Sequence, residues 1–144
     1  SGVMEDCIMP RLFRESPVNA IWEGSGNVQC LDTLRALQKE PDVLAAYFAE
    51  VSEARGSDRR FDEFLARLQT DFGNTRDVEY RARNLVDRLA LTMQASLLIR
   101  HSTPAVADAF CASRLISGGG LNFGNLPTGT DASAVIRRAC PVVD

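Results

Sequence analysis

The chain has 144 residues, of which 45% are hydrophobic and 24% charged, and its formal net charge is −3 at pH 7. This composition is typical of one globular domain, and no apolar run approaches the roughly 20 residues that a bilayer requires. The acidic balance argues against wholesale nucleic-acid binding. The charge is uneven, however, because residues 1–73 hold 8 basic and 13 acidic side chains, whereas residues 74–144 hold 8 basic and 6 acidic ones.

The four cysteines are far apart in the sequence and show no Cys-x-x-Cys spacing. With one histidine in the chain, His101, this arrangement predicts no metal site. We expect the cysteines to be small buried apolar residues of a protein in a reducing compartment, which corresponds to a cytoplasmic location.

The first third of the chain predicts two helices. Pro10 suits the first turn of a short helix that ends near Glu15, since Ser16-Pro17 is expected to break it. Residues 18–22 are expected to form an extended connector. A second helix opens near Ser25 and stops before Pro41, with Val28, Leu31, Leu34 and Leu37 at helical spacing.

Helical periodicity continues to the end of the chain. The pattern predicts helices over 42–54, from an N-cap at Asp58 to Gly73, over 75–101 with Val78, Leu85, Leu89, Met93 and Leu97 in the core, and from Pro104 to Ile116. Residues 117–130 read as a loop, and Asp131 is expected to cap a last short helix that ends near Cys140. With short connections throughout, the sequence predicts an all-α, antiparallel helical bundle.

The segment Ile21-Trp22-Glu23-Gly24-Ser25-Gly26-Asn27 is the strongest candidate site. Its simplest interpretation is a helix start, with Ser25 as the N-cap and acidic charge near the positive end of the helix dipole. The functional interpretation is that the glycines let a cofactor or substrate approach the backbone while Glu23 acts as a base. Ile21 and Trp22 would then keep water away from Glu23.

The stretch from Met9 to Asn27 resembles the end of the catalytic domain of the acyl-CoA dehydrogenase superfamily, in which an arginine-bearing helix leads into an aromatic-Glu-Gly-Thr/Ser element. The form Trp-Glu-Gly-Ser-Gly-Asn, followed by Cys30-Leu31-Asp32, is similar to the AidB-like, or alkylation-response, branch, often labelled isovaleryl-CoA dehydrogenase-like. Close similarity covers residues 2–38. The resemblance implies that residues 1–40 end the catalytic domain and that 41–144 form a helical extension.

The resemblance also implies the chemistry of the site. Glu23 would be the catalytic base that removes the α proton of an acyl-CoA, and Gly24 would lie near the thioester. Gly2, Ser25, Gly26 and Asn27 would contact FAD. Because the flavin would be held mainly by domains that precede Ser1, we expect the chain to be an inactive piece of a longer enzyme that forms a homo-oligomer, a tetramer by resemblance.

Two other functions remain open. The AidB-like branch is thought to bind DNA through its helical tail, and the candidates for contact with double-stranded DNA here are Arg35, Arg76, Arg83 and Arg114. The alternative for these arginines is pairing with neighbouring carboxylates, such as Asp77, Glu79, Asp87 and Asp108, on an ordinary solvated face. The third possibility is a purely oligomerising bundle without chemistry of its own.

Overall fold

The computed structural model describes residues 3–74, 76–116 and 126–140, apart from the side chain of Glu23. All regular structure in these ranges is helical, so the predicted all-α bundle is confirmed. The elements are α1 (Met9–Ile21), the 3₁₀ turn η1 (Trp22–Gly24), α2 (Ser25–Lys39), α3 (Pro41–Ser52), α4 (Arg59–Gly73), α5 (Ala82–His101), α6 (Pro104–Arg114) and α7 (Ala132–Ala139).

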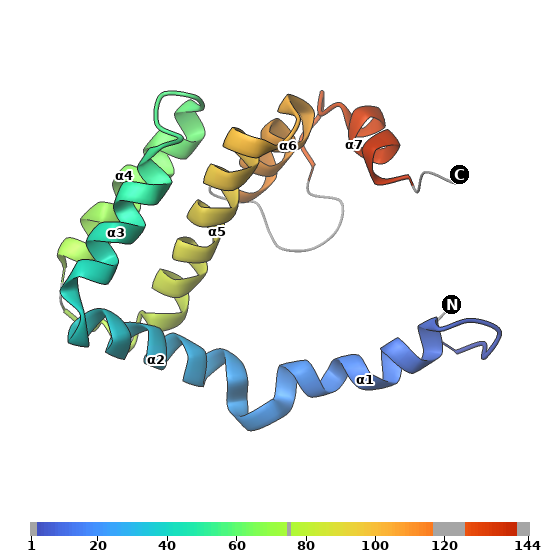
Figure 1. Ribbon diagram of the computed structural model, residues 1–144, viewed down its shortest axis with the longest axis horizontal. Coiled ribbons are helices and arrows are strands. Elements are labelled where there is room, and N and C mark those ends of the chain that lie inside the picture. Colours follow the sequence, from blue (N-terminus) through green and yellow to red (C-terminus); the bar gives the residue numbers. More distant parts are fainter. Residues whose placement is uncertain (1–2, 75, 117–125, 141–144) are drawn as a thin grey trace.

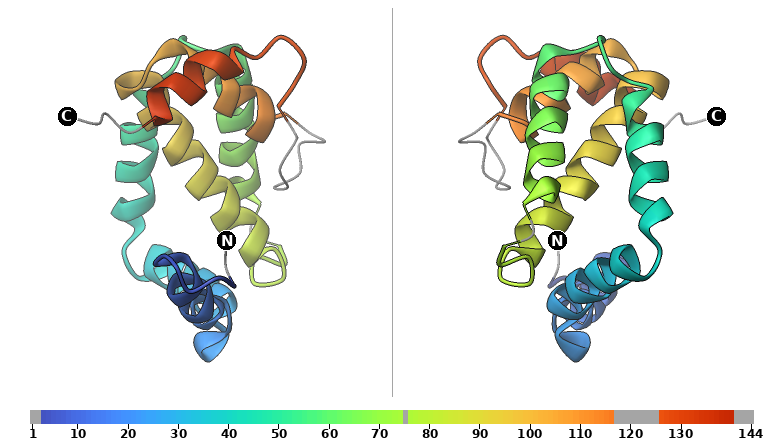
Figure 2. Two further views of the ribbon diagram at one scale, coloured as in Figure 1. Left: turned by 90° about the vertical axis from the view of Figure 1, so that its right-hand side faces the viewer. Right: turned by 90° about the vertical axis from the view of Figure 1, so that its left-hand side faces the viewer.

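The chain rises through α3, descends through α4 and rises again through α5, while α2 crosses the lower end of these three helices (Figure 1). α6 and α7 lie at the opposite end of α5. The two side views in Figure 2 place α1 and α2 together at one end of the molecule. Among the described elements, α1 contacts only η1 and α2, so it projects from the bundle as an arm. No helix in the described ranges is long and apolar enough to cross a membrane.

The main core forms around α4. The Asp58 carboxylate accepts hydrogen bonds from the backbone N–H groups of Arg60 and Phe61, which confirms Asp58 as the predicted N-cap. Phe61, Leu65 and Leu68 then fall on one face at helical spacing and are fully buried. Phe61 and Leu65 belong to a buried cluster that consists of Val51, Ala54, Phe61, Leu65, Ala95, Cys111 and Leu115.

A smaller cluster attaches α2 to α5. Leu34 of α2 is buried against Ala82 and Leu85 of α5, and Cys30 and Leu31 pack on its edge. Because these contacts involve the middle of α2 and the first turns of α5, they fix where the start of α2 lies relative to the bundle. The predicted domain boundary at residue 40 coincides with the junction between α2 and α3 and remains a prediction.

The prediction that the first helix ends near Glu15 is wrong, since α1 continues through Pro17 to Ile21. Proline has no N–H, so Pro17 cannot donate to the carbonyl oxygen of Phe13 one turn earlier. The hydroxyl of Ser16 donates to that same oxygen at 3.1 Å. The side chain therefore replaces the missing backbone bond, and the helix tolerates a residue that the sequence indicated as a break.

The long helix begins at Ala82 rather than near residue 75. The side-chain oxygen of Asn74 accepts from the backbone N–H of Arg76, and Asp77 has a φ of 51°. Side-chain bonding of this kind competes with helix formation, and the left-handed residue interrupts the helical turn. The Arg81 guanidinium donates to the carbonyl oxygens of Asp71 and Asn74, which stabilises the turn that separates α4 from α5.

Two residues that helical spacing placed on a buried face are exposed. Val28 and Leu97 expose 47% and 43% of their surface. Of the loop predicted over 117–130, residues 117–125 lie outside the described ranges, whereas the predicted cap Asp131 is confirmed by its bond to the N–H of Ala134.

Candidate functional site

The backbone changes direction at Gly24, between η1 and α2. Gly24 has a φ of +63°, in the left-handed region that disfavours side chains, and a Cβ placed on it would meet no atom within 4 Å. Glycine is therefore required here by conformation and not by crowding. The backbone of Glu23 lies in η1 directly before Gly24, and the side chain of Glu23 lies outside the described part. We call the segment Trp22–Asn27 the joint between α1 and α2. Gly2, the other predicted flavin contact, also lies outside the described residues.

Ser25 does not cap α2, so that part of the helix-start interpretation is wrong. Gly24 occupies the N-cap position, and no side chain makes a capping bond there. The Ser25 hydroxyl instead donates to the carbonyl oxygen of Asn19 at 3.2 Å. This bond spans the joint, because Asn19 belongs to α1, and it holds the end of α1 against the start of α2.

Ile21 and Trp22 do not form a dry pocket in this structure. Because the side chain of Glu23 lies outside the described part, the prediction that they shield it from water stays a prediction. Their own exposed fractions are 73% and 62%. Ile21 and Trp22 are exposed because α1 projects from the bundle and contacts no described element other than η1 and α2. The segment is thus an open apolar and glycine-rich surface.

The far side of the joint is supplied by α5. The Arg83 Nε donates to the side-chain oxygen of Asn27 at 3.3 Å. A Cβ built on Gly26 would lie 3.7 Å from Nη2 of the same arginine. Gly26 and Asn27, both predicted to contact flavin, therefore lie beside the guanidinium of Arg83, which is a predicted DNA contact.

The four arginines proposed for DNA come from separate elements. Arg35 pairs with Asp32 one turn earlier on α2, and Arg83 is bonded to Asn27. Arg76 is exposed in the turn before α5, and Arg114 ends α6. Of the carboxylates named as alternative partners, Asp108 is ion-paired, but with Arg60 of α4. DNA contact by these arginines remains an untested prediction.

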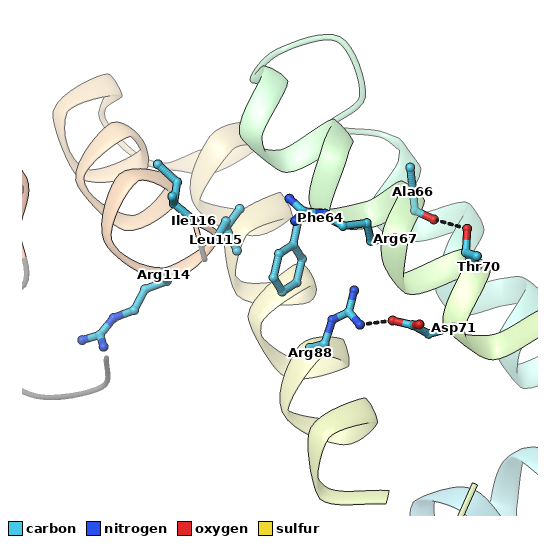
Figure 3. Close-up of a pocket in the computed structure, with 9 residues that line it drawn as sticks. All are labelled: Phe64, Ala66, Arg67, Thr70, Asp71, Arg88, Arg114, Leu115 and Ile116. Atoms are coloured by element: carbon cyan, nitrogen blue, oxygen red, sulfur yellow. Dashed lines mark hydrogen bonds and ion pairs between the residues drawn. The ribbon is translucent and has the colours of Figure 1, made fainter. Parts of the chain in front are cut away.

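A hollow of about 480 Å³ between α4, α5 and α6 was not anticipated from the sequence (Figure 3). Its lining includes Phe64, Asp71, Arg88 and Arg114. The Arg88 side chain is bonded to Asp71 and lies over the Phe64 ring, 5.2 Å from the ring centre. The pairing of Arg88 with Asp71 across 17 residues is a tertiary contact that no sequence pattern indicated.

No cluster of three or more histidine, cysteine, aspartate or glutamate side chains within the described ranges could hold a metal ion. The candidate site predicted from the sequence, Trp22–Asn27, has one open apolar face and one face against Arg83. The exposed backbone of this segment can contact a flat or extended ligand, provided that another part of the protein covers the ligand.

Comparison with known proteins finds relatives of this chain. No protein-family model matches the chain. The chain is 39% identical over 125 residues to a protein of Escherichia coli (strain K12) that is described as the acyl-CoA dehydrogenase AidB. The alignment covers 85% of this chain and 22% of that relative. The chain is 28% identical over 151 aligned positions to acyl-CoA dehydrogenase family member 11 of Caenorhabditis elegans, with 99% of this chain and 24% of the relative covered.

The chain belongs to the acyl-CoA dehydrogenase superfamily and corresponds to the C-terminal part of proteins of that superfamily. Within the superfamily it is AidB-like, as the Trp-Glu-Gly-Ser-Gly-Asn element predicted. The chain spans less than a quarter of the length of either relative.

Proposed function

We propose that the chain acts within a longer, FAD-dependent acyl-CoA dehydrogenase-like protein, in which Glu23 is the catalytic base. One observation carries the proposal: the Trp22–Asn27 element lies at a solvent-open joint whose backbone is accessible at two glycines. The reaction class is α,β-dehydrogenation of an acyl-CoA thioester.

The described residues fit a flavin. A Cβ at Gly24 would meet nothing within 4 Å, and one at Gly26 would approach only Arg83, so a ring or phosphate could reach van der Waals contact with the backbone. Exposed Ile21 and Trp22 add apolar surface beside the joint. When bound, FAD would supply the acceptor for the hydride that leaves the β carbon.

Each residue of the joint has a distinct part in this proposal. Glu23 takes the α proton, which is general-base catalysis by a carboxylate. Gly24 leaves room for the thioester, and the backbone of Ser25, Gly26 and Asn27 contacts the cofactor, together with Gly2. Trp22 and Ile21 exclude water once the remainder of the longer protein covers them, because a dry site strengthens the base and protects the reaction.

The test uses the longer protein that contains this chain. Anaerobic addition of isovaleryl-CoA should bleach the visible flavin spectrum of the wild type, whereas Glu23→Gln should keep FAD and lose the bleaching. Glu15→Gln, at an exposed acidic residue of α1, is the matched control and should bleach like the wild type. A longer protein that folds but cannot be loaded with FAD would overturn the proposal.

The apolar surface of the arm supports a homo-oligomeric assembly as part of this function. Large hydrophobic side chains are exposed along the arm, and they include Met9, Leu12, Phe13 and Val18. Exposed apolar patches of this kind mark surfaces that become covered by protein. The sedimentation mass of the longer protein should therefore exceed that of a monomer, and a monomer at micromolar concentration would contradict the assembly.

A further inference from the structure

Arg83 connects the helical extension to the candidate site. It lies in the first turn of α5, and its Nε donates to the side-chain oxygen of Asn27, 56 residues earlier, at 3.3 Å. Both residues are exposed, so the bond does not belong to the packed core. The α2–α5 cluster of Leu34, Ala82 and Leu85 already holds the middle of α2 in place. The bond from Arg83 acts at a different point, because Asn27 lies in the first turn of α2.

The same guanidinium covers one flank of that turn. A Cβ on Gly26 would lie 3.7 Å from Nη2 of Arg83, and, its two chain neighbours aside, no other side chain among the described residues would come within 4 Å of it. Gly26 and Arg83 also line a shallow hollow of about 580 Å³ between α2 and α5. A ligand on the Gly24–Asn27 backbone would therefore have the positive charge of Arg83 beside it.

We propose that Arg83 is a positioning residue for the flavin-contacting turn: by holding Asn27 it fixes the backbone of Gly24–Asn27 in the orientation that receives the cofactor. This inference rests on the proposed function. It gives the extension a direct part in the site, because α5 supplies the residue that orients the turn. No capping side chain holds the start of α2, and the Asn27 contact restrains this turn from the bundle side.

The first experiment uses the 144-residue chain and needs no cofactor. Amide hydrogen exchange at Gly26 and Asn27, followed by NMR, should be about fivefold faster in Arg83→Met than in the wild type, since a lost hydrogen bond to a charged donor loosens the turn. Arg59→Met removes the same charge from an arginine that is 90% exposed on α4 and should leave this exchange unchanged. Both variants should unfold at the wild-type denaturant midpoint.

The second experiment measures FAD affinity and the flavin spectrum of the longer protein. Arg83→Met should raise the Kd for FAD about fivefold to tenfold and shift the flavin absorption bands. Arg83→Lys should recover part of the affinity, because it keeps a cationic donor. In the double variant with Asn27→Ala, Arg83→Met should add no further loss, because both substitutions break one contact.

The outcomes separate the two proposals. If the longer protein never binds FAD, the proposed function fails, and the exchange measurement on the chain alone decides the role of Arg83. If FAD binds but Arg83→Met matches Arg59→Met in affinity, spectrum and exchange, the positioning role is overturned while the proposed function stands. Additive losses from Arg83→Met and Asn27→Ala would also overturn it.

Discussion

Arg60 on α4 donates a hydrogen bond to Asp108 on α6 at 2.8 Å, across 48 residues of sequence. The same guanidinium binds Asp58, the residue that caps α4. One arginine thus joins the start of α4 to α6 above the buried Cys111 of the core cluster. Burial raises the pKa of the Cys111 thiol to about 11. This relationship ties helix capping to tertiary packing and makes the stability of the bundle depend on pH.

Stability should fall in acid through Asp58. The hydrogen bond from Arg60 is the largest cause that holds the pKa of Asp58 below its usual value, and backbone bonds from Arg60 and Phe61 add to it. Because the folded-state pKa is lowered, this stabilisation is present above the unfolded-state pKa of about 4 and is lost as the pH falls through the folded-state value. Urea unfolding between pH 7 and pH 2.5 should show the loss, and Asp58→Asn should reduce it.

Removal of the whole cap tests the same residue at neutral pH. Asp58→Ala should lower the free energy of unfolding by about 1–3 kcal/mol, because α4 loses its cap and Arg60 loses a partner. Asp131→Ala removes an equivalent cap from α7, which buries no residue, and should cost less than about 0.5 kcal/mol. Equal losses for the two variants would contradict the coupling between the Asp58 cap and the core.

Phe61 should dominate the core energetics. Its side chain is fully buried in the main cluster, so Phe61→Ala should lower the free energy of unfolding by about 3–5 kcal/mol through lost apolar burial and a cavity. Phe13 offers the matched control, because it is 63% exposed on the arm. Chemical unfolding of Phe13→Ala should resemble that of the wild-type chain, and a comparable loss there would place the arm inside the cooperative core.

Tyr47 should respond to alkaline pH. Its hydroxyl donates to the carbonyl oxygen of Leu89 at 2.7 Å, and burial raises its pKa to about 12. Because the folded-state pKa exceeds the unfolded value of about 10, the stabilisation is complete below pH 10 and is lost as the pH rises toward 12.

Tyr47→Phe should remove that alkaline loss and cost about 1 kcal/mol at neutral pH, as measured by denaturant unfolding. Tyr80 is 93% exposed, so Tyr80→Phe should leave the free energy of unfolding at neutral pH within about 0.5 kcal/mol of the wild type. An alkaline loss of the same size in Tyr47→Phe as in the wild type would show that other groups cause it.

The Ser16–Pro17 pair should control the helicity of the arm. Ser16→Ala leaves the Phe13 carbonyl without its hydroxyl donor and should fray α1 at that turn, while Pro17→Ala restores the backbone donor and should strengthen it. Backbone chemical shifts of residues 12–20 report the helix directly. If Ser16→Ala frays α1 as much in the Pro17→Ala background as alone, the replacement of the missing bond by Ser16 is wrong.

Helical periodicity determined the fold class, the caps at Asp58 and Asp131 and much of the core, because an α-helix satisfies its backbone locally and repeats its buried face every three or four residues. The Trp-Glu-Gly-Ser-Gly-Asn element likewise indicated the superfamily, since a short contiguous segment carried that resemblance. These features depend on neighbours in the chain, and the sequence alone was enough to predict them.

The tertiary structure decided what depends on distant residues. The helix boundaries near Pro17 and before α5 differ from the prediction for a more local reason, since the Ser16 hydroxyl donates to the Phe13 carbonyl and the Arg76 N–H donates to the Asn74 side chain. The position of Arg83 beside Gly26 and Asn27 depends on how α5 packs on α2. Sequence spacing could not reveal that contact, because the two segments meet only after the intervening helices have folded back.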